Sequence, residues 1–303
     1  MTEHIVPDSE ARGVMVLLPP LPRDLASMAR LDRPIGWWLL FWPGAWAIAL
    51  SGNGLASWRL MLWFLLGSIA MRGAGCVWND IIDRDLDKQV ARTAARPVAS
   101  GRVSVTLAAM WMGALCLVGL VVLLQLRWQA QLTAFASLAL VAAYPFMKRI
   151  TWWPQAWLGL VFSWGALVGW VQLRSDNLHV LAALYVGSAC WVIGYDTIYA
   201  LQDREDDALV GIRSSALRMG GRVRAGVGLC YGAALALWAL AFWWLRPDVL
   251  ALAALLPVAA HLGWQVLSLA PEDGDNTLAR FRSNRLAGLL MALACWVVGN
   301  AGV

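Results

Sequence analysis

Charged residues are scarce in this chain of 303 residues. Asp, Glu, Lys and Arg together make up 14% of it, whereas apolar residues make up 60%. Ordinary soluble domains carry about 25% charged residues. The apolar residues gather in repeated runs of about 20, and a run of that length can cross a bilayer as a helix. The scarcity of charge therefore excludes an ordinary soluble protein and predicts one that crosses a membrane several times.

Histidine and cysteine are also few. The three histidines are scattered, and the five cysteines all fall within apolar runs without any Cys-x-x-Cys pattern. This spacing indicates neither a zinc site nor a disulfide framework. No motif that interleaves basic and aromatic residues accompanies the net charge of +5, so we expect no nucleic-acid partner.

The first thirty residues lack the features of a cleaved leader. They contain four acidic residues, whereas mitochondrial transit peptides are poor in acids. The apolar stretch at 14–18 is too short for the core of a signal peptide. We therefore expect residues 1–34 to form a cytoplasmic tail and the protein to lie in a bacterial inner membrane.

Nine apolar segments follow this tail. Helix is the expected structure for each, because backbone polar groups in lipid must be satisfied within the segment. The sequence thus predicts an all-α, polytopic protein with one domain of nine transmembrane helices at 35–303. The segments span 35–51, 58–80, 104–124, 128–146, 153–173, 178–201, 223–245, 248–269 and 283–301.

Basic residues alternate between the loops. The tail and the even-numbered loops hold 19 of the 24 Lys and Arg residues, the odd-numbered loops hold four, and Arg72 lies within the second segment. Positive charge is retained on the cytoplasmic side of membranes. The N-terminus is therefore predicted to be cytoplasmic, with the C-terminus on the opposite side.

Acidic residues concentrate in two short stretches: the first acidic window, residues 79–87, and the second acidic window, residues 196–207. Nine of the 19 acidic residues lie in them. Residues four and seven apart share a helix face. One face therefore carries Asn79, Asp83 and Asp87, and another carries Asp196, Asp203 and Asp207. The acids off these faces, Asp85, Glu205 and Asp206, are interpreted as surface charges.

Acidic residues at the membrane boundary repel one another unless positive charge lies between them. Hard oxygen ligands without His or Cys favour Mg²⁺, which often shares its coordination with substrate phosphates. The predicted ligands are Asn79, Asp83, Asp87, Asp203 and Asp207. The windows end the second and sixth segments, so a duplication could bring them together across a cavity. A solvated helix end is the alternative interpretation.

Basic residues supply the complementary charge. Arg92 and Arg96 follow the first window, and Lys148 and Arg149 end the fourth segment close to Tyr144. Guanidinium groups match phosphate oxygens in bidentate fashion, and lysine adds a compact charge. We expect Arg92, Arg96 and Lys148 to contact a diphosphate; retention of the loops in the cytoplasm is the alternative.

Arg72 lies inside the second segment, seven residues before Asn79 and on the same face. An arginine within a membrane span is a functional candidate. It could pair with the acids or bind the carboxylate of a small anionic substrate, and the residue pattern leaves both readings open.

Several of these stretches resemble the UbiA family of intramembrane aromatic prenyltransferases. They are residues 72–87, 92–101, 144–149 and 195–207, with shorter matches at 32–36 and 281–284. The resemblance spans nearly the whole chain and implies nine helices around a central cavity open to lipid. The strings at 144–149 and 195–200 resemble the members that prenylate 4-hydroxybenzoate.

The resemblance implies a reaction and roles for individual residues. A polyprenyl group would pass from polyprenyl diphosphate to the ring carbon ortho to the hydroxyl of 4-hydroxybenzoate, with Mg²⁺ as cofactor and in ubiquinone synthesis. The lipid bilayer would supply the polyprenyl substrate. The implied catalytic residues are Asp196, Tyr199 and Tyr144, and the implied substrate-binding residues are Arg72, Arg92, Arg96, Lys148 and Arg149.

Two other functions fit parts of the pattern. A family member could prenylate another acceptor, such as a naphthoate, homogentisate or a porphyrin. A transporter of divalent cations or organic anions could use acidic helices as its pathway, but its acids would lie at the middle of the bilayer. Here they cluster at one interface, which favours the enzyme.

Overall fold

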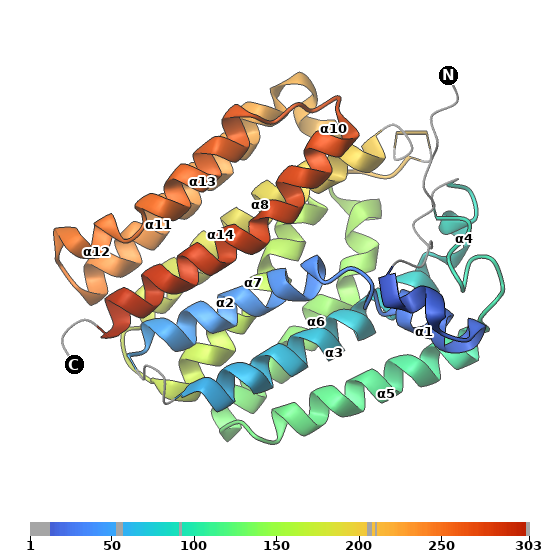
Figure 1. Cartoon of the computed structure of the whole chain (residues 1–303), viewed down its shortest axis with the longest axis horizontal. Helices are drawn as coiled ribbons and strands as arrows, with labels where there is room; N and C mark the ends of the chain where they lie inside the picture. The colour runs from blue at the N-terminus through green and yellow to red at the C-terminus, as the bar shows by residue number, and fades with distance from the viewer. Residues whose placement is uncertain (1–12, 53–56, 91–92, 205–207, 210, 301–303) are drawn as a thin grey trace. The chain divides into compact units, whose positions relative to one another are not determined.

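The computed structural model describes residues 13–52, 57–90, 93–204, 208–209 and 211–300. Every regular element within these ranges is a helix (Figure 1). The chain forms two compact units, each described here by itself. The first unit comprises Met1–Trp37 and Leu65–Leu124, and the second comprises Trp38–Phe64 and Gln125–Val303. The predicted single domain at 35–303 stays a prediction.

Among the described residues, eight helices are long and apolar enough to cross a membrane. The helix α2 (Ile35–Leu50) is also apolar but has only 16 residues. The predicted all-α, polytopic fold is therefore confirmed, and each predicted apolar segment corresponds to helical structure. The predicted cytoplasmic side of the N-terminus stays a prediction.

The first unit contains part of the expected tail as well as membrane helices. Its described elements are η1 (Gly13–Leu17), α1 (Pro20–Met28), α3 (Trp58–Ile82), α4 (Arg84–Asp87) and α5 (Val105–Leu123), although α3 begins in the second unit. One apolar cluster joins α1, α3, α5 and the loop before α5. Because Met28 and Ala29 are buried in this cluster, the end of α1 is part of the folded unit.

The second unit is built around α8 (Leu178–Ala200). This helix packs against α7 (Pro154–Leu173), α11 (Val223–Leu245) and α14 (Gly274–Asn300). The remaining elements are α6 (Trp128–Ile150), η3 (Leu201–Asp203), α10 (Ser215–Met219), η4 (Gly220–Arg222), α12 (Val249–Ala253) and α13 (Leu256–Leu267), together with most of α2.

Small residues and tryptophans hold the second unit together. A Cβ atom added to Gly165 would lie 3.2 Å from the backbone nitrogen of Gly44, so α2 and α7 approach almost backbone to backbone. Such small-residue contacts are typical of membrane helix pairs. The rings of Trp46 and Trp191 lie 5.0 Å apart, and those of Trp46 and Trp238 lie 5.3 Å apart. All three side chains are fully buried.

Three helix boundaries differ from the prediction. The last helix begins at Gly274 rather than near 283, because the basic stretch that was read as a loop is helical. The segment at 248–269 forms two helices, and Pro257 occupies the first turn of the second, where its missing N–H costs no hydrogen bond. The second segment ends at Ile82, inside the first acidic window.

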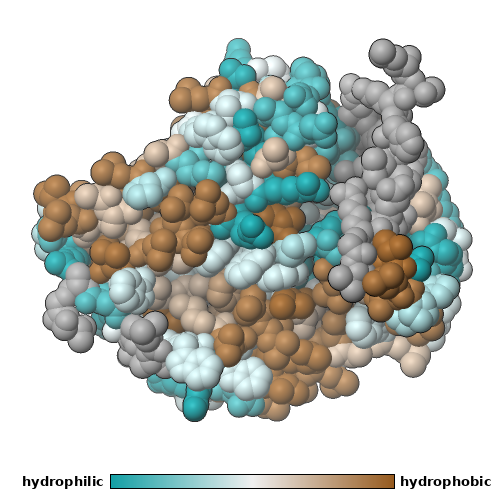
Figure 2. All heavy atoms as spheres, viewed as in Figure 1, coloured by the Kyte–Doolittle hydropathy of each residue, from teal (hydrophilic) through white to brown (hydrophobic). Residues whose placement is uncertain are grey.

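The outer surface of α5 is apolar. Met110, Leu117 and Val121 have 67%, 63% and 52% of their surface exposed. Apolar side chains also cover much of the visible face in Figure 2. A surface of this kind suits the hydrocarbon interior of a bilayer rather than water.

Candidate functional site

The first acidic window continues the course of α3 through a short break. Asp83 lies between α3 and α4; its N–H donates to the Asn79 carbonyl at 2.9 Å, and the Asp87 N–H donates to the Asp83 carbonyl at 2.8 Å. The four-residue spacing is therefore maintained along the window. Asp83 and Asp87 are buried, with 1% and 7% exposure, whereas Asn79 is half-buried.

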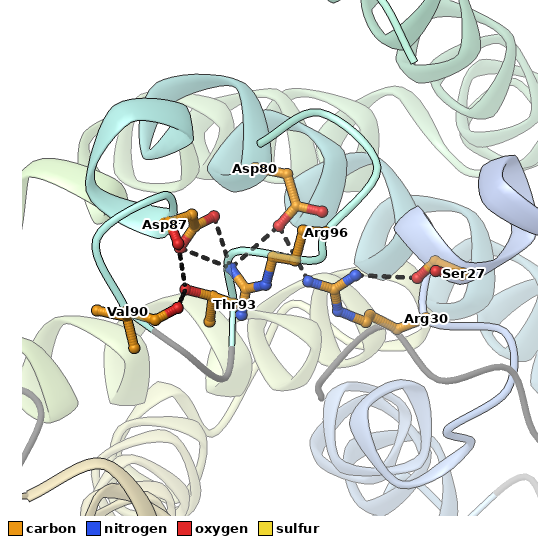
Figure 3. Close-up of polar contacts among 7 residues, drawn as sticks. All are labelled: Ser27, Arg30, Asp80, Asp87, Val90, Thr93 and Arg96. Atoms are coloured by element: carbon orange, nitrogen blue, oxygen red, sulfur yellow. Dashed lines mark hydrogen bonds and ion pairs between the residues drawn. The ribbon is translucent and has the colours of Figure 1, made fainter. Parts of the chain in front are cut away.

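Two arginines place positive charge among these acids (Figure 3). Nη1 of Arg96 donates to both carboxylate oxygens of Asp87, at 3.2 and 3.0 Å, and to Oδ1 of Asp80 at 3.3 Å. Nη2 of Arg30 donates to the same Oδ1 of Asp80 at 2.9 Å. Asp80 is 1% exposed and both arginine side chains are 13% exposed. The positive charge expected among the acids is therefore supplied here by two arginines of the protein itself, Arg30 and Arg96.

The loop that carries Arg96 is fastened at both ends. The Thr93 hydroxyl donates to the Asp87 carbonyl at 2.9 Å. Val98 and Val103 are buried in the apolar cluster of the first unit. These contacts fix the loop beside the first window and explain why Arg96 reaches Asp87. Arg92 lies outside the described residues, and its diphosphate contact stays a prediction.

Asp85 differs from its acidic neighbours. Its side chain is 72% exposed and pairs with Arg84 and Lys88 on the surface, at 3.3 and 3.1 Å. The hydrogen bonds from Arg84 and then Lys88 lower the pKa of this carboxyl group. The interpretation of Asp85 as a surface charge agrees with this position, and the residue provides a matched control for Asp83.

Arg72 packs against the beginning of α2. A Cβ atom added to Gly36 would lie 2.8 Å from Nε of Arg72, so the absence of a side chain at residue 36 leaves room for the guanidinium. Gly36 belongs to the short stretch 32–36 that the resemblance singled out. The contact explains why a glycine suits position 36, because a larger residue would collide with Arg72. The role of Arg72 in holding an aromatic acid stays a prediction.

The second acidic window begins on α8 in the second unit. Asp196 and Tyr199 are half-buried near the end of α8, and the chain then tightens into η3, where Asp203 lies. The ring of Tyr199 lies 4.5 Å from that of Phe281 on α14, at an interplanar angle of 37°. Asp207, Glu205 and Asp206 lie outside the described residues, so their predicted positions stay predictions.

Polar contacts hold the chain in place after α8. The side-chain nitrogen of Gln202 donates to the Gly274 carbonyl at 2.8 Å, and Arg204 pairs with Glu272 at the same distance. These contacts tie this segment to the first residue of α14 and to the turn just before it. The position of Asp203 is therefore fixed from α14 as well as from α8.

The basic residues at the end of α6, Lys148 and Arg149, lie in its last turn, and Tyr144 lies one turn before them. Tyr144 and Lys148 are half-buried, and Arg149 is exposed. Arg213 closes this helix end, because its N–H donates to the Lys148 carbonyl at 3.0 Å and its guanidinium donates to the Ile150 carbonyl at 2.7 Å. From the sequence, Arg213 was counted only among the basic residues of the even-numbered loops.

The donor atoms of the predicted metal ligands fit a hard divalent cation, since they are carboxylate and amide oxygens. Within the described parts of the chain, no three His, Cys, Asp or Glu side chains gather closely enough to hold a metal by themselves. Ligands from a bound phosphate group would complete such a shell. The two windows lie in different units, and their predicted meeting stays a prediction.

Sequence reasoning missed two members of the first cluster. Asp80 was not chosen as a site residue, although its seven-residue separation from Asp87 places the two on one side of a helix. Arg30 had been counted only for its charge, and it lies 50 residues before its partner. Nothing local in the sequence indicates that contact.

Comparison with known proteins identifies the family. The model of the UbiA prenyltransferase family matches residues 40–296. The chain belongs to the UbiA prenyltransferase family. The 4-hydroxybenzoate polyprenyltransferase, mitochondrial, of Drosophila melanogaster is 43% identical over 275 residues, which are 89% of this chain and 70% of that protein. The protein with the same name in Arabidopsis thaliana is 39% identical over 297 residues, covering 93% and 70%.

Solved structures support the UbiA fold. A UbiA homolog from Archaeoglobus fulgidus bound to GPP and Mg²⁺ has a TM-score of 0.67 and 16% sequence identity, and the match covers 91% of this chain and 99% of that one. Another structure of the homolog from this organism is bound to Cd²⁺ and has a TM-score of 0.62 and 16% identity, with coverage of 88% and 97%. At this identity the likeness concerns the fold.

The relatives correct the predicted location. The two relatives named 4-hydroxybenzoate polyprenyltransferase, from Drosophila melanogaster and Arabidopsis thaliana, are eukaryotic and are named as mitochondrial proteins. These names contradict the bacterial inner membrane predicted from the acidic N-terminal residues. The acid content of the first residues bears on whether they resemble a transit peptide. It does not identify the membrane in which the helices lie. The multi-pass membrane character is unaffected.

Proposed function

We propose that this chain transfers a polyprenyl group from polyprenyl diphosphate to 4-hydroxybenzoate, at the ring carbon ortho to the hydroxyl, as a step in ubiquinone biosynthesis. The observation that carries the proposal is 43% identity, over 89% of the chain, to a protein named 4-hydroxybenzoate polyprenyltransferase. The names of the relatives favour a mitochondrial membrane for this reaction.

The first window supports the diphosphate end of the proposal. Asn79, Asp83 and Asp87 would hold Mg²⁺, assisted by Asp203 and Asp207 of the second window. When bound, the metal would neutralise charge on the departing diphosphate and so lower the barrier to breaking the allylic C–O bond. The Archaeoglobus homolog with GPP and Mg²⁺ supports magnesium as the ion, while its Cd²⁺ complex supports divalent ions more generally.

Basic residues would bind the leaving group. Arg92, Arg96, Lys148 and Arg149 would donate to diphosphate oxygens as negative charge develops on them. Arg96 already lies among carboxylates in the first unit, 3.0 Å from Asp87. Because charge-assisted hydrogen bonds strengthen when their acceptor becomes more negative, these residues would stabilise the separated diphosphate more than the intact substrate.

Aromatic side chains would protect the carbocation that remains. Tyr199 has Phe281 against its ring at 4.5 Å, and Tyr144 lies on α6. Aromatic faces attract cations, and apolar walls exclude the water that would otherwise trap one. Arg72 would hold the carboxylate of 4-hydroxybenzoate so that the ortho carbon faces the cation.

Formation of the carbon–carbon bond and loss of a ring proton complete the reaction. The electron-rich ortho carbon attacks the allylic carbon and forms the new C–C bond. The ring carbon loses its proton, which passes to Asp196 or to the released diphosphate, and aromaticity returns. Asp196 lies one helical turn before Tyr199 on α8, as a base beside the cation would require.

The test uses membranes that contain the protein, 4-hydroxybenzoate, a polyprenyl diphosphate and Mg²⁺. Prenylated 4-hydroxybenzoate is expected by mass spectrometry and should disappear with EDTA and return with added Mg²⁺. Asp83→Asn should abolish the product, whereas Asp85→Asn should preserve it, because Asp83 is buried and Asp85 is 72% exposed only two residues away.

Parallel reactions contain a naphthoate, homogentisate or a porphyrin in place of 4-hydroxybenzoate. Prenylation of one of these acceptors alone would refute the proposed substrate and retain the proposed mechanism. Equal activity of the Asp83→Asn and Asp85→Asn proteins would refute the role given to the first acidic window.

A further inference from the structure

Arg30 occupies a backbone position that normally belongs to glycine. The helix α1 ends at Met28, the Arg30 N–H donates to the Ser27 carbonyl at 3.0 Å, and the Leu31 N–H donates to the Ala26 carbonyl at 3.1 Å. These two hydrogen bonds form the Schellman motif, in which the residue after the C-cap adopts the left-handed conformation. That residue is Arg30, with φ of 54°.

An arginine at this position is conformationally costly. Left-handed backbone brings Cβ too close to the following carbonyl oxygen, and glycine avoids that contact. Such conformations persist where the surrounding structure enforces them, and they cluster at functional sites. Arg30 is also one of only two described non-glycine residues with positive φ. The left-handed backbone favours glycine at this position, so the presence of an arginine side chain requires an explanation.

The side chain of Arg30 turns toward a buried acid. Its Nη1 donates to the Ser27 carbonyl and its Nη2 to Oδ1 of Asp80, each at 2.9 Å (Figure 3). The Ser27 contact fixes the direction of the guanidinium, because it returns to the helix end from which the arginine emerges. Asp80 is 1% exposed, and solvent therefore screens this ion pair only weakly.

A second arginine, Arg96, links Asp80 to the proposed metal ligand Asp87. Oδ1 of Asp80 accepts from Arg30 at 2.9 Å and from Arg96 at 3.3 Å, while the same Nη1 of Arg96 reaches Asp87 at 3.0 Å. Arg96 is thus shared between two carboxylates. With Arg30 present, Asp80 has a closer cation; without it, Asp80 would compete for Arg96 and draw it from Asp87.

We propose that Arg30 is a positioning residue: it neutralises Asp80 and thereby keeps Arg96 beside Asp87, where a metal-bound diphosphate is to be received. The inference rests on the proposed function, because it assigns Asp87 and Arg96 to the diphosphate site. It extends that site to the end of α1, in a region that the sequence indicated only as a tail.

The test compares Arg30→Gly, Arg30→Lys and Asp80→Asn, and combines the first and third in a double variant. Arg30→Gly suits the left-handed backbone, so the helix end is retained while the charge is lost. Arg30→Lys retains the charge. Arg102→Gln is the matched control, because it removes the ion pair of Arg102 with Asp24, whose side chains are 44% and 17% exposed.

The first readout is steady-state prenylation. We expect Arg30→Gly to lower kcat/KM for the polyprenyl diphosphate by about tenfold, the effect of losing one hydrogen bond to a buried charge. The KM for 4-hydroxybenzoate should not change. Arg30→Lys should recover most of the activity, and Arg102→Gln should match the wild type. Loss of the fold alone would not separate the two substrates in this way.

The double variant tests the route through Asp80. If Arg30 acts through that residue, adding Asp80→Asn to Arg30→Gly should cause no further loss, because the uncompensated charge has been removed. Multiplied losses in the double variant, or wild-type kinetics of Arg30→Gly, would overturn the inference.

The second readout does not depend on prenyl transfer. Thermal unfolding of the full chain in detergent is followed with and without Mg²⁺ and inorganic pyrophosphate. The wild type and Arg102→Gln should be stabilised by the pair of ligands, and Arg30→Gly should be stabilised less. Equal stabilisation of all three, or none of the wild type, would overturn the inference. A wild type stabilised by these ligands but inactive with every acceptor would overturn only the proposed function.

Discussion

A buried polar network in the second unit allows a quantitative prediction. Oδ1 of Asn284 accepts from Trp191 Nε1 at 2.9 Å and from Gln265 Nε2 at 3.3 Å, and its Nδ2 donates to Gln265 Oε1 at 3.1 Å. The Tyr231 hydroxyl donates to the same Gln265 oxygen at 2.9 Å. The four side chains come from α14, α8, α13 and α11, and none is more than 2% exposed.

Replacement of Asn284 by Ala removes the acceptor of two buried donors, Trp191 Nε1–H and Gln265 Nε2–H. A buried donor without an acceptor costs about 1–3 kcal/mol. Hydrogen bonds between membrane helices contribute only about 0.6 kcal/mol on average. The lower end of the first range is therefore appropriate, and two donors give a loss of about 2 kcal/mol.

The assay is thermal unfolding in detergent at one fixed scan rate, because unfolding of such proteins is often irreversible. Extrapolation from mid-sized domains predicts that Asn284→Ala lowers the apparent Tm by about 4–8 °C. Asn300→Ala is the control on the same helix, since the hydrogen bond that Asn300 donates among the described residues, to the Trp296 carbonyl, stays within α14. Equal Tm values for the two variants would refute the idea that the network joins the four helices.

Three further outcomes follow from other contacts. Gly36→Ala should displace Arg72 and raise the KM for 4-hydroxybenzoate, while the KM for the polyprenyl diphosphate changes little. An unchanged KM for 4-hydroxybenzoate in steady-state assays would contradict the role of Arg72. Phe281→Leu removes the ring beside Tyr199 and should lower kcat by about threefold to tenfold, as expected for one aromatic pair, with unchanged kinetics counting against that contact. Arg213→Gln should speed proteolysis near the end of α6, measured by limited trypsin digestion against Arg218→Gln as the control.

The helices could be predicted because length and apolarity alone decide them in a membrane. The segment at 153–173 corresponds to α7 within one residue, and Pro154 occupies the first turn, where proline is tolerated. The predicted start of the last helix at 283 was wrong because the basic residues Arg280 and Arg282 were read as part of the loop before it. The helix continues beyond that point to Gly274, since a polar stretch can remain helical outside lipid.

The candidate site was predictable only where chemistry and spacing are local. The windows and the lysine and arginine beside them are visible as residue types at helical intervals. The bond between Arg30 and Asp80 depends on how α1 folds back onto α3, and the Tyr199–Phe281 contact joins α8 to α14. Such long-range contacts arise from packing of elements, which periodicity within a single segment does not specify.

The fastening of the Arg96 loop has a consequence for how a long isoprenoid reaches its place. Val98 and Val103 are buried with Met28, and Thr93 bonds to the Asp87 carbonyl. Swinging this loop aside would expose those valines and break that bond. Displacing the loop to admit a long isoprenoid would therefore expose apolar surface that is now buried, which favours keeping Val98 and Val103 in place.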